Sequence, residues 1–208
     1  MGAAKPASNK ALIVVDLQID FCPGGALAVP DGHLIVPLVN SLIERFDHVI
    51  LTQDWHPDDH HSFASSHAGK EPFGSITLHY GEQTLWPDHC VQETEGAEFH
   101  DELNWGKAEL VLRKGFRRHI DSYSAFFEND RTTPTGLNGY LKERGLTDLT
   151  FVGLATDFCV GYSALDAARL GFHATVRTDA CRAIDLNGSL AEAEKQMRAA
   201  GVKLATAA

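Results

Sequence analysis

No run of apolar residues in this sequence approaches the ~18 residues of a membrane-spanning helix, and the longest, at 11–15, has only the length of a strand. The N-terminal stretch Met1–Lys10 also lacks the apolar core of a secretory signal peptide. Basic residues are few, because 18 Lys and Arg stand against 28 Asp and Glu, and the formal net charge is −10. Their only dense group lies at 113–118. We therefore expect a cytoplasmic protein that binds neither a membrane nor nucleic acid.

Cysteine is also scarce, with four residues in a chain of 208. They are too few and too widely spaced for a disulfide scaffold, and none forms the C-x-x-C pair of a zinc knuckle. Free thiols in a reducing compartment are the simplest interpretation. For Cys22, Cys90 and Cys181 we expect no special role, only small buried side chains.

What the sequence does contain is an ordinary hydrophobic content of 44%, enough for a sizeable core. Short apolar runs that predict strands alternate with longer amphipathic segments that predict helices. Gly145, Gly171 and Gly201 stand where helix C-caps belong. This β-α-β-α order predicts a single α/β domain of three layers, with helices on both faces of a mainly parallel sheet. The predicted strands are 11–16, 48–54, 109–114, 148–153, 173–178 and 202–205, and the predicted helices are 34–46, 136–144, 157–170 and 189–200.

One stretch of about 50 residues, 55–107, breaks this alternation, and loops of that length are uncommon in compact domains unless they are functional or disordered. It is rich in His, Pro, Gly and Asp and shows no clear periodicity. Its three tryptophans argue against disorder. We expect an ordered insertion over the sheet edge, held by aromatic side chains or by a metal ion. Six of the 11 histidines lie close together in its part 56–89: His56, His60, His61, His67, His79 and His89.

Four chemically distinctive residues end or follow the predicted strands. Asp16, Asp54 and Lys114 end the first three, and the fourth strand runs through Gly153 towards Cys159. In an open α/β sheet, ligands bind beyond the carboxyl ends of the strands. We therefore expect two acids, a base and a thiol to meet at one edge of the sheet, which is the composition of an active site.

Cys159 is the candidate nucleophile. If Thr156 or Asp157 caps the following helix, the sulfur lies in its first turn, where the helix dipole favours a thiolate. A nearby Lys114 would lower the pKa of the thiol further, and Asp16 could accept its proton. The alternative is a buried structural cysteine, which is common for free thiols. The neighbouring strand ends favour the nucleophile.

Asp54 and His56 lie two residues apart on one side of an extended segment. Together with His60 or His61 and with His89, they offer enough nitrogen and oxygen ligands for a Zn, Mn or Fe ion. Each histidine alone is more often a solvated loop residue. Their clustering beside a predicted nucleophile favours a metal site.

Several longer motifs carry a resemblance to a known family. They are VVDLQIDF (14–21), QDWHP (53–57), WPDHCVQ (86–92), RKG (113–115), DSYSAFF (121–127) and GLATDFCV (153–160). In order and spacing they resemble the nicotinamidases, also called pyrazinamidases, of the isochorismatase-like cysteine hydrolase superfamily. The resemblance runs from about Lys10 to the C-terminus, and the motifs together are highly specific.

The resemblance implies a single-domain α/β fold with a six-stranded parallel sheet. We place this domain at 10–208, after a flexible segment at 1–9, with a metal-binding loop region at about 54–107. The resemblance also implies hydrolysis of nicotinamide to nicotinate and ammonia in NAD salvage, and of pyrazinamide to pyrazinoate. By motif position, Asp16, Lys114 and Cys159 match the catalytic triad.

Asp54, His56 and His89 match, by the same resemblance, the ligands of one divalent metal ion that orients the pyridine ring. Zn2+ is the first expectation, and Fe2+ and Mn2+ are alternatives. His60 is a candidate for an additional ligand, because family members differ in using a histidine there. His61 follows it directly, so the choice between the two stays open.

The resemblance also implies a cis peptide bond before Ala155, which turns the N–H groups of Ala155 and Cys159 into an oxyanion hole. It implies that Phe21, Trp86 and Tyr123 enclose the pyridine ring of a small-molecule substrate. From the sequence alone, these aromatic residues could equally belong to the core. The oligomeric state stays open between a monomer and a homo-oligomer.

Three alternative functions compete with this interpretation. A sister amide hydrolase of the superfamily would act on a different small amide, but such enzymes lack the full set of metal-ligand motifs. A catalytically inert family member would be expected to have lost Asp16, Lys114 or Cys159, and none is lost. In a true metallohydrolase a metal-bound hydroxide would be the nucleophile, and Cys159 would be merely structural.

Overall fold

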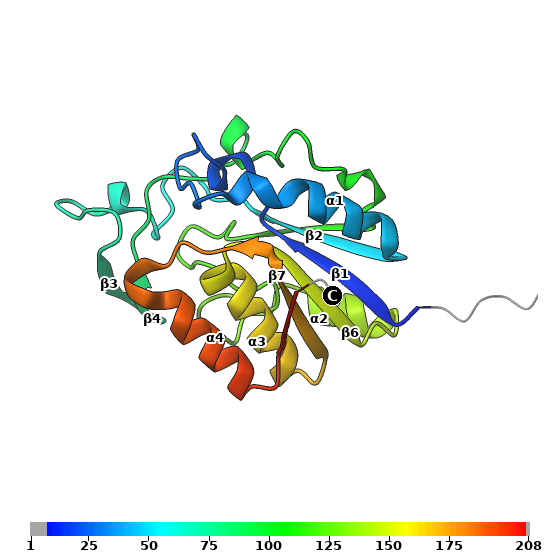
Figure 1. Ribbon diagram of the computed structural model, residues 1–208. Coiled ribbons are helices and arrows are strands. Elements are labelled where there is room, and N and C mark those ends of the chain that lie inside the picture. The colour runs from blue at the N-terminus through cyan, green and yellow to red at the C-terminus, as the bar shows by residue number, and fades with distance from the viewer. Residues whose placement is uncertain (1–7, 207–208) are drawn as a thin grey trace, which may run out of the picture.

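The computed structural model describes residues 8–206. Most of the segment 1–9, for which flexibility is predicted, lies outside the described residues. The main sheet consists of β1 Lys10–Val15, β2 His48–Asp54, β5 Leu110–Lys114, β6 Asp148–Leu154, β7 His173–Arg182 and β8 Lys203–Ala205. These six strands are parallel and lie in the order β5-β2-β1-β6-β7-β8 (Figure 1), which confirms the predicted fold class and sheet.

Helices cover both faces of this sheet (Figure 1). They are α1 Val36–Arg45, α2 Leu137–Glu143, α3 Gly161–Arg169 and α4 Ser189–Ala199. Side chains of β1 alternate between two cores: Leu12 and Val14 pack with α1 on one face. Ala11, Ile13 and Val15 pack with the other three helices on the opposite face. Because both faces are buried, β1 reads as one continuous apolar run.

The structure confirms the predicted C-terminal ends of three helices but not the predicted start of one of them. Gly145, Gly171 and Gly201 follow α2, α3 and α4 closely, as predicted for C-caps. The helix predicted from residue 157, however, begins as a π-helical turn, Thr156–Val160, and becomes α-helical only at Gly161. That turn carries the candidate nucleophile.

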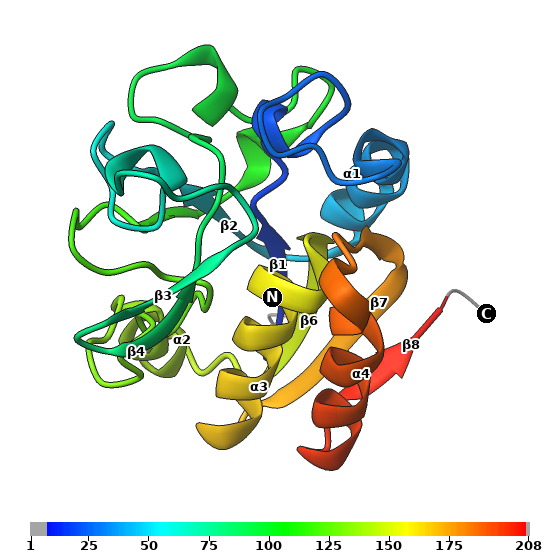
Figure 2. The same ribbon diagram turned by 90° about the vertical axis from the view of Figure 1, so that its left-hand side faces the viewer.

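The insertion at 55–107 is ordered, as predicted, and contains an antiparallel hairpin of β3 Ser75–Leu78 and β4 Gly81–Thr84. The sequence pattern does not reveal this hairpin, because its residues are mainly polar and partly exposed. Two short bridges hold other parts of the insertion, one between His56 and Val91 and one between Phe63 and Trp86. The hairpin lies on the side toward which β1 and β2 run, at the left of Figure 1 and facing the viewer in Figure 2.

The chain order creates a switch point between two neighbouring strands. From β1 the chain continues to β2 on one side, whereas β6, which pairs with β1 on the other side, is reached only after β5. Ligands bind at such points in open α/β sheets. Gly153 (φ 116°) allows the two strands to approach here, because a Cβ atom would overlap the carbonyl oxygen of Val15.

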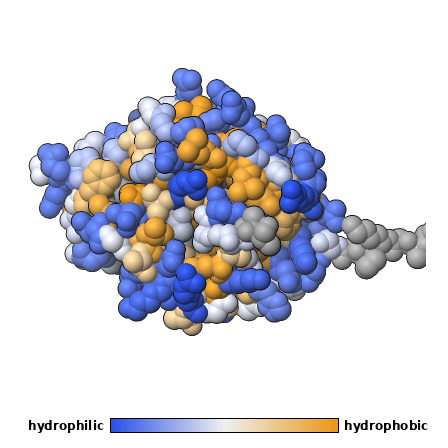
Figure 3. All heavy atoms as spheres, in the orientation of Figure 1, coloured by the Kyte–Doolittle hydropathy of each residue, from blue (hydrophilic) through white to orange (hydrophobic). Residues whose placement is uncertain are grey.

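Within residues 8–206, no helix combines the length and the apolar character that a membrane crossing requires. Figure 3 shows apolar residues that reach one face of the molecule between hydrophilic ones. Exposed large apolar side chains include those of Leu34, Phe73 and Trp105. Scattered exposure of this kind is normal for a folded chain.

Candidate active site

The strand ends bring four ionisable side chains together, as predicted. The ammonium group of Lys114 lies 2.7 Å from a carboxylate oxygen of Asp16, 2.7 Å from one of Asp54, and 3.4 Å from the Cys159 sulfur. It also donates a hydrogen bond to the carbonyl oxygen of Ser122 at 3.1 Å. The four ionisable side chains are buried. A cation, two acids and a thiol in contact and shielded from water can exchange protons.

Register and one hydroxyl group fix this geometry. Asp54 and Lys114 are register partners at the ends of β2 and β5. Asp16 follows β1 in a left-handed conformation (φ 44°). The hydroxyl of Thr52 accepts the backbone N–H of Asp16 at 3.2 Å and donates to its carboxylate at 2.6 Å. One carboxylate oxygen of Asp16 is thereby bonded to Thr52, and the other faces Lys114.

Burial and the attraction of opposite charges shift the pKa values of these groups in opposite directions. Burial raises the pKa of Asp16 above its usual value of 3.8, against the attraction of Lys114 and with the help of Asp54. Burial would also raise the pKa of Asp54, but Lys114 and His56 hold it well below its usual range. The pKa of Lys114, which burial alone would lower, is raised well above its usual range by the two carboxylates. The two acids therefore have different proton affinities, as acid–base catalysis requires.

The prediction that the Cys159 thiol has a lowered pKa is wrong. Burial raises this pKa well above its usual range. Lys114 opposes the effect, but the carboxylates of Asp16 and Asp54 act on the same sulfur and add to it. At neutral pH the Cys159 side chain is therefore a thiol, and a nucleophilic role for it would require a base to take its proton. Asp16, which has a carboxylate oxygen within 4.8 Å of the Cys159 sulfur, is placed to be that base.

The turn before Cys159 confirms one expectation and corrects another. The peptide bond between Leu154 and Ala155 is cis, as the resemblance implies. Neither Thr156 nor Asp157 caps a helix, because the cap of the π-helical turn is Ala155, which makes no side-chain cap bond. The position of the sulfur is set by tertiary contacts rather than by a capped first turn.

The carboxylate of Asp157 instead anchors the loop that follows β7. It accepts hydrogen bonds from the backbone N–H groups of Ile184 and Asp185, at 3.1 and 2.7 Å, and from the hydroxyl of Ser189 at 2.5 Å. Ile184 lines the pocket above Cys159. Asp157 thus links the turn of the nucleophile to one wall of the pocket.

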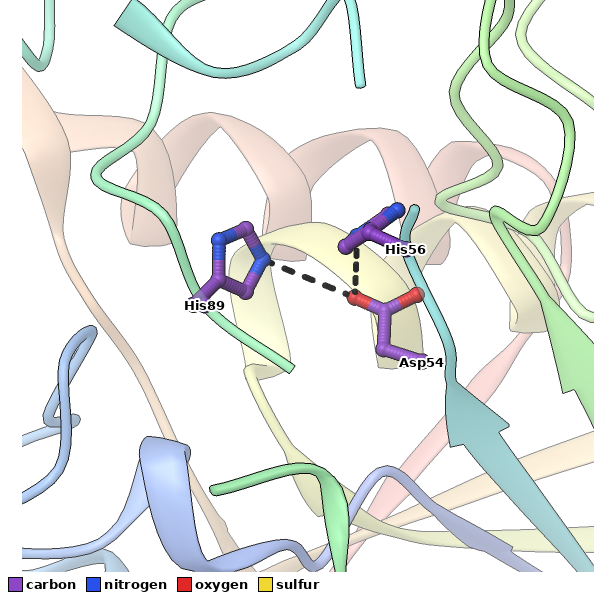
Figure 4. Close-up of side chains that lie close together, drawn as sticks. All are labelled: Asp54, His56 and His89. Atoms are coloured by element: carbon purple, nitrogen blue, oxygen red, sulfur yellow. Dashed lines mark ion pairs between the residues drawn. The ribbon is translucent and has the colours of Figure 1, made fainter. Parts of the chain in front are cut away.

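Asp54 also faces two histidines (Figure 4). One of its oxygens lies 3.3 Å from Nε2 of His56 and 3.7 Å from Nε2 of His89. The Nδ1 atoms of these rings bond to backbone carbonyl oxygens, that of Gly115 for His56 at 2.9 Å and that of Pro87 for His89 at 2.8 Å. Donation from Nδ1–H leaves both Nε2 atoms with lone pairs directed at the same carboxylate. This donor set fits a divalent metal ion.

Gly115 gives His56 the space for this position. It has a φ of 67°, and a Cβ atom there would overlap the imidazole ring of His56. Burial would lower the pKa of His56, but Asp54 raises it above the usual value. The glycine of the RKG motif therefore serves the geometry of the candidate metal site.

His60, rather than His61, lies on the inner side of the insertion. It is fully buried, with its ring centroid 4.4 Å from that of His56. Its Nδ1 lies 2.7 Å from the hydroxyl of Ser62, and its Nε2 lies 3.2 Å from the carbonyl oxygen of Ile120. Burial lowers its pKa to about 4, so the ring is neutral at pH 7. His61 is only partly buried, and its ring contacts other histidines near the surface.

A pocket opens over Cys159 and is lined by the predicted aromatic residues Phe21, Trp86 and Tyr123. The indole N–H of Trp86 donates to the hydroxyl of Tyr123 at 3.1 Å. Phe158 contacts both rings edge to face, with centroids 4.9 and 5.7 Å away. Because Phe158 directly precedes Cys159 in the sequence, its place in the pocket could have been predicted. The other pocket residues that were not predicted come from loops. The lining residues for which no pocket role is predicted from the sequence are Leu27, Asp121, Phe158 and Ile184.

The other three cysteines lie outside the group around Lys114. Cys22, Cys90 and Cys181 are buried free thiols, as predicted. Burial raises the pKa of Cys22 to about 11 and that of Cys181 to about 12. Neither is a ready nucleophile at neutral pH.

Comparisons with known proteins identify the family of this chain. The family model of the isochorismatase domain matches residues 10–208. A nicotinamidase of Acinetobacter baylyi is 56% identical over 199 residues, which are 96% of this chain and 93% of the relative. A solved structure described as a nicotinamidase and pyrazinamidase of Acinetobacter baumanii has a TM-score of 0.95 at 56% identity. The match covers 97% of this chain and 98% of that one.

A more distant structure also matches over nearly the whole chain. It is a pyrazinamidase of Pyrococcus horikoshii in complex with zinc, with a TM-score of 0.77 and 34% identity. The match covers 96% of this chain and all of that one. Because the family model and these relatives extend over nearly the full sequence, this protein belongs to the isochorismatase family.

Proposed function

We propose that this protein is an amide hydrolase that converts nicotinamide to nicotinate and ammonia. The observation that carries the proposal is the contact of Lys114 with Asp16, Asp54 and Cys159 at an aromatic pocket. An amide has a poorly electrophilic carbonyl and a poor leaving group. Its hydrolysis needs a nucleophile, a proton donor for the nitrogen and stabilisation of the oxyanion. Pyrazinamide carries the same carboxamide on an aromatic nitrogen ring and is a second substrate of the same chemistry.

In the first half of the reaction the Cys159 thiol attacks the amide. Asp16 takes the thiol proton as the sulfur bonds to the carbonyl carbon, and the carbonyl electron pair moves to the oxygen. The backbone N–H groups of Ala155 and Cys159 donate to this oxyanion, and loss of one such donor typically costs ~100-fold or more. Asp16 then delivers its proton to the nitrogen, the C–N bond breaks, and ammonia leaves behind a thioester.

In the second half, water hydrolyses the thioester. Asp16 takes a proton from the water while the water oxygen bonds to the carbonyl carbon. The C–S bond then breaks, the sulfur recovers a proton from Asp16, and nicotinate is released. The ammonium group of Lys114 stabilises the negative charge when it lies on Asp16 and when it lies on the Cys159 sulfur. The raised pKa of Asp16 makes it a stronger base than an ordinary aspartate.

The aromatic pocket holds the flat ring of the substrate. Phe21, Trp86 and Tyr123 enclose it, so that the carboxamide points toward the sulfur. The hydrogen bond between the Trp86 indole and the Tyr123 hydroxyl orients two of these rings relative to each other.

Asp54, His56 and His89 would hold one divalent ion, with His60 as a candidate for an additional ligand. When bound, the ion supplies a Lewis-acid contact, direct or through water, that orients the pyridine nitrogen. We favour Zn2+, because an aspartate and two histidines suit it and a relative was solved with zinc. Fe2+ and Mn2+ suit the same ligands.

The cellular setting follows from the reaction. Nicotinate is the form in which nicotinamide re-enters NAD salvage. Buried free cysteines accord with a reducing compartment, and we assign the protein to the cytoplasm.

Ammonia release from nicotinamide tests the proposal. Wild type, Cys159→Ala and the control Cys22→Ala, altered at a buried cysteine outside the Lys114 group, are assayed before and after metal removal. We expect release from wild type and from Cys22→Ala, none above background from Cys159→Ala, and recovery of chelated wild type on addition of a divalent metal.

Two results would contradict parts of this proposal. If metal-loaded wild type released no ammonia, the substrate would be wrong, and other small amides would be screened next. If Cys159→Ala kept its activity, the nucleophile would be wrong, and a metallohydrolase mechanism would replace the thioester.

A further inference from the structure

We propose that His61 and His119 form a second site for a divalent transition-metal ion, at the surface and separate from Asp54, His56 and His89. Nε2 of His61 lies 3.3 Å from Nδ1 of His119, and the ring centroids are 4.6 Å apart with the planes at 77°. His61 is partly buried and His119 is exposed. The inference rests on the geometry of this pair and does not depend on the reaction proposed above.

The distance between the two nitrogen atoms matches an edge of a tetrahedral coordination shell. Zinc–imidazole bonds are about 2.0–2.1 Å long, so two nitrogens on one tetrahedral ion lie about 3.3–3.4 Å apart. Without an ion, one ring donates a hydrogen bond to the other. With an ion between them, both nitrogens supply lone pairs, and each ring keeps its proton on the opposite nitrogen.

The two loops that carry these histidines are already joined. The backbone N–H of His61 donates to the carbonyl oxygen of Arg118, directly before His119, at 2.9 Å. On the inner side, Nε2 of His60 lies 3.2 Å from the carbonyl oxygen of Ile120. The backbone therefore holds the two rings near each other, and binding of an ion requires little additional ordering.

Two more donor side chains lie in the neighbourhood, although among the described residues neither forms a group of three with the pair whose ligand atoms are all within 4.8 Å of one another, so either would have to move to reach an ion on the pair. The ring centroid of His67 is 5.9 Å from that of His61, and its Nε2 bonds to the His61 carbonyl oxygen, which leaves Nδ1 as a lone-pair donor. Asp59 acts electrostatically on His61 and is ion-paired with Arg118 at 2.9 Å. Both partners of this ion pair are 52% exposed, so the pair adds little stability and can be exchanged for a metal contact. Imidazole and carboxylate ligands with positions left for water suit Zn2+, Ni2+ and Cu2+.

Counting bound zinc tests the second site. Wild type, His119→Gln and the control His79→Gln, altered at an exposed histidine of the β3–β4 hairpin, are dialysed to equilibrium against the same micromolar zinc buffer. Zinc per chain and nicotinamide hydrolysis are then measured. We expect wild type and His79→Gln to bind one zinc per chain more than His119→Gln, and all three proteins to hydrolyse nicotinamide at the same rate.

Equal zinc content in wild type and His119→Gln would overturn the inference. Loss of both zinc and activity in His119→Gln would overturn it as well, because His119 would then serve the central metal group. If no protein hydrolyses nicotinamide but the difference of one zinc persists, the second site stands and the proposed function falls.

Discussion

The charged cluster and the aromatic pocket occupy the same crevice but are built differently. Asp16, Asp54 and Lys114 stand at the carboxyl ends of neighbouring strands, where the register of the sheet sets their distances. Trp86 and Tyr123 come from loops, and side-chain hydrogen bonds hold them. The cluster is therefore positioned by the most cooperative part of the fold, and the pocket by a few separate contacts.

This difference assigns different kinetic effects to the two regions. In the proposed reaction the strand-end groups exchange protons with the reacting atoms, so changes there should lower kcat and, where a buried charge loses its partner, the free energy of unfolding. In the proposed reaction the pocket walls bind the substrate ring in the ground state and in the transition state alike, so changes there should raise KM.

The largest effect is expected for Lys114→Met. Loss of the ammonium group leaves the buried carboxylates of Asp16 and Asp54 facing each other without a cation, and breaking a buried pair in this way costs about 3–5 kcal/mol. Activity should fall by about 100-fold or more. Chemical denaturation and ammonia release measure the two effects, with Lys142→Met, at an exposed position of α2, as the control. A stable variant with near wild-type activity would show that Lys114 is not required for the function of the cluster.

Asp16→Asn should leave binding nearly intact and reduce kcat. The amide keeps the size of the side chain but cannot take a proton, and general-base catalysis contributes about 100- to 10,000-fold. Steady-state kinetics should show this loss in kcat with little change in KM. The exposed control Asp101→Asn should behave as wild type. A rise in KM at unchanged kcat would show that Asp16 only shapes the pocket.

The pH profile of kcat/KM should have an acid limb. The pKa of Asp16 is raised above 3.8 by burial, and the base has to be ionised to act. Activity should therefore fall as pH decreases through this raised pKa, about tenfold per unit once Asp16 is mostly protonated. The raised pKa values of Cys159 and Lys114 predict no loss near neutral pH. A profile that stays flat down to about pH 4, the range of an ordinary aspartate, would contradict this assignment.

The smallest effect is expected for Tyr123→Phe. The hydroxyl accepts hydrogen bonds from Trp86 at 3.1 Å and Gln83 at 2.9 Å, and its loss leaves a buried indole N–H without this partner. At about 1 kcal/mol for such a bond, KM should rise about fivefold with kcat unchanged. Tyr140→Phe on α2 is the control. A drop in kcat as large as that of Asp16→Asn would end the distinction between the two regions.

The same difference explains what the sequence could predict. Asp16, Asp54 and Lys114 follow recognisable apolar runs, and parallel strands bring their carboxyl ends to one edge, so their meeting was predictable. Phe21, Trp86 and Tyr123 could be assigned to the pocket only through the family resemblance. No period relates residues of separate loops, which is why Leu27 and Ile184 were missed.

Reasoning from neighbouring residues in the sequence failed where residues distant in the sequence determine the pKa or the contacts. It predicted a lowered pKa for Cys159 from the helix terminus and Lys114, but the two carboxylates and burial reverse the direction. It considered Thr156 or Asp157 as a helix cap, whereas neither caps a helix and the Asp157 carboxylate anchors the loop after β7. It could not choose between His60 and His61, because adjacent residues on a loop differ only in which side faces the core.

The central claim is that Cys159 forms an acyl-enzyme, and partitioning with hydroxylamine tests it most directly. The purified protein is given nicotinamide or methyl nicotinate in the presence of hydroxylamine, and nicotinohydroxamate and nicotinate are quantified. The account predicts the same ratio of the two products from both substrates, because both pass through one thioester that either nucleophile can attack. Formation of nicotinate alone, or ratios that depend on the leaving group, would contradict it.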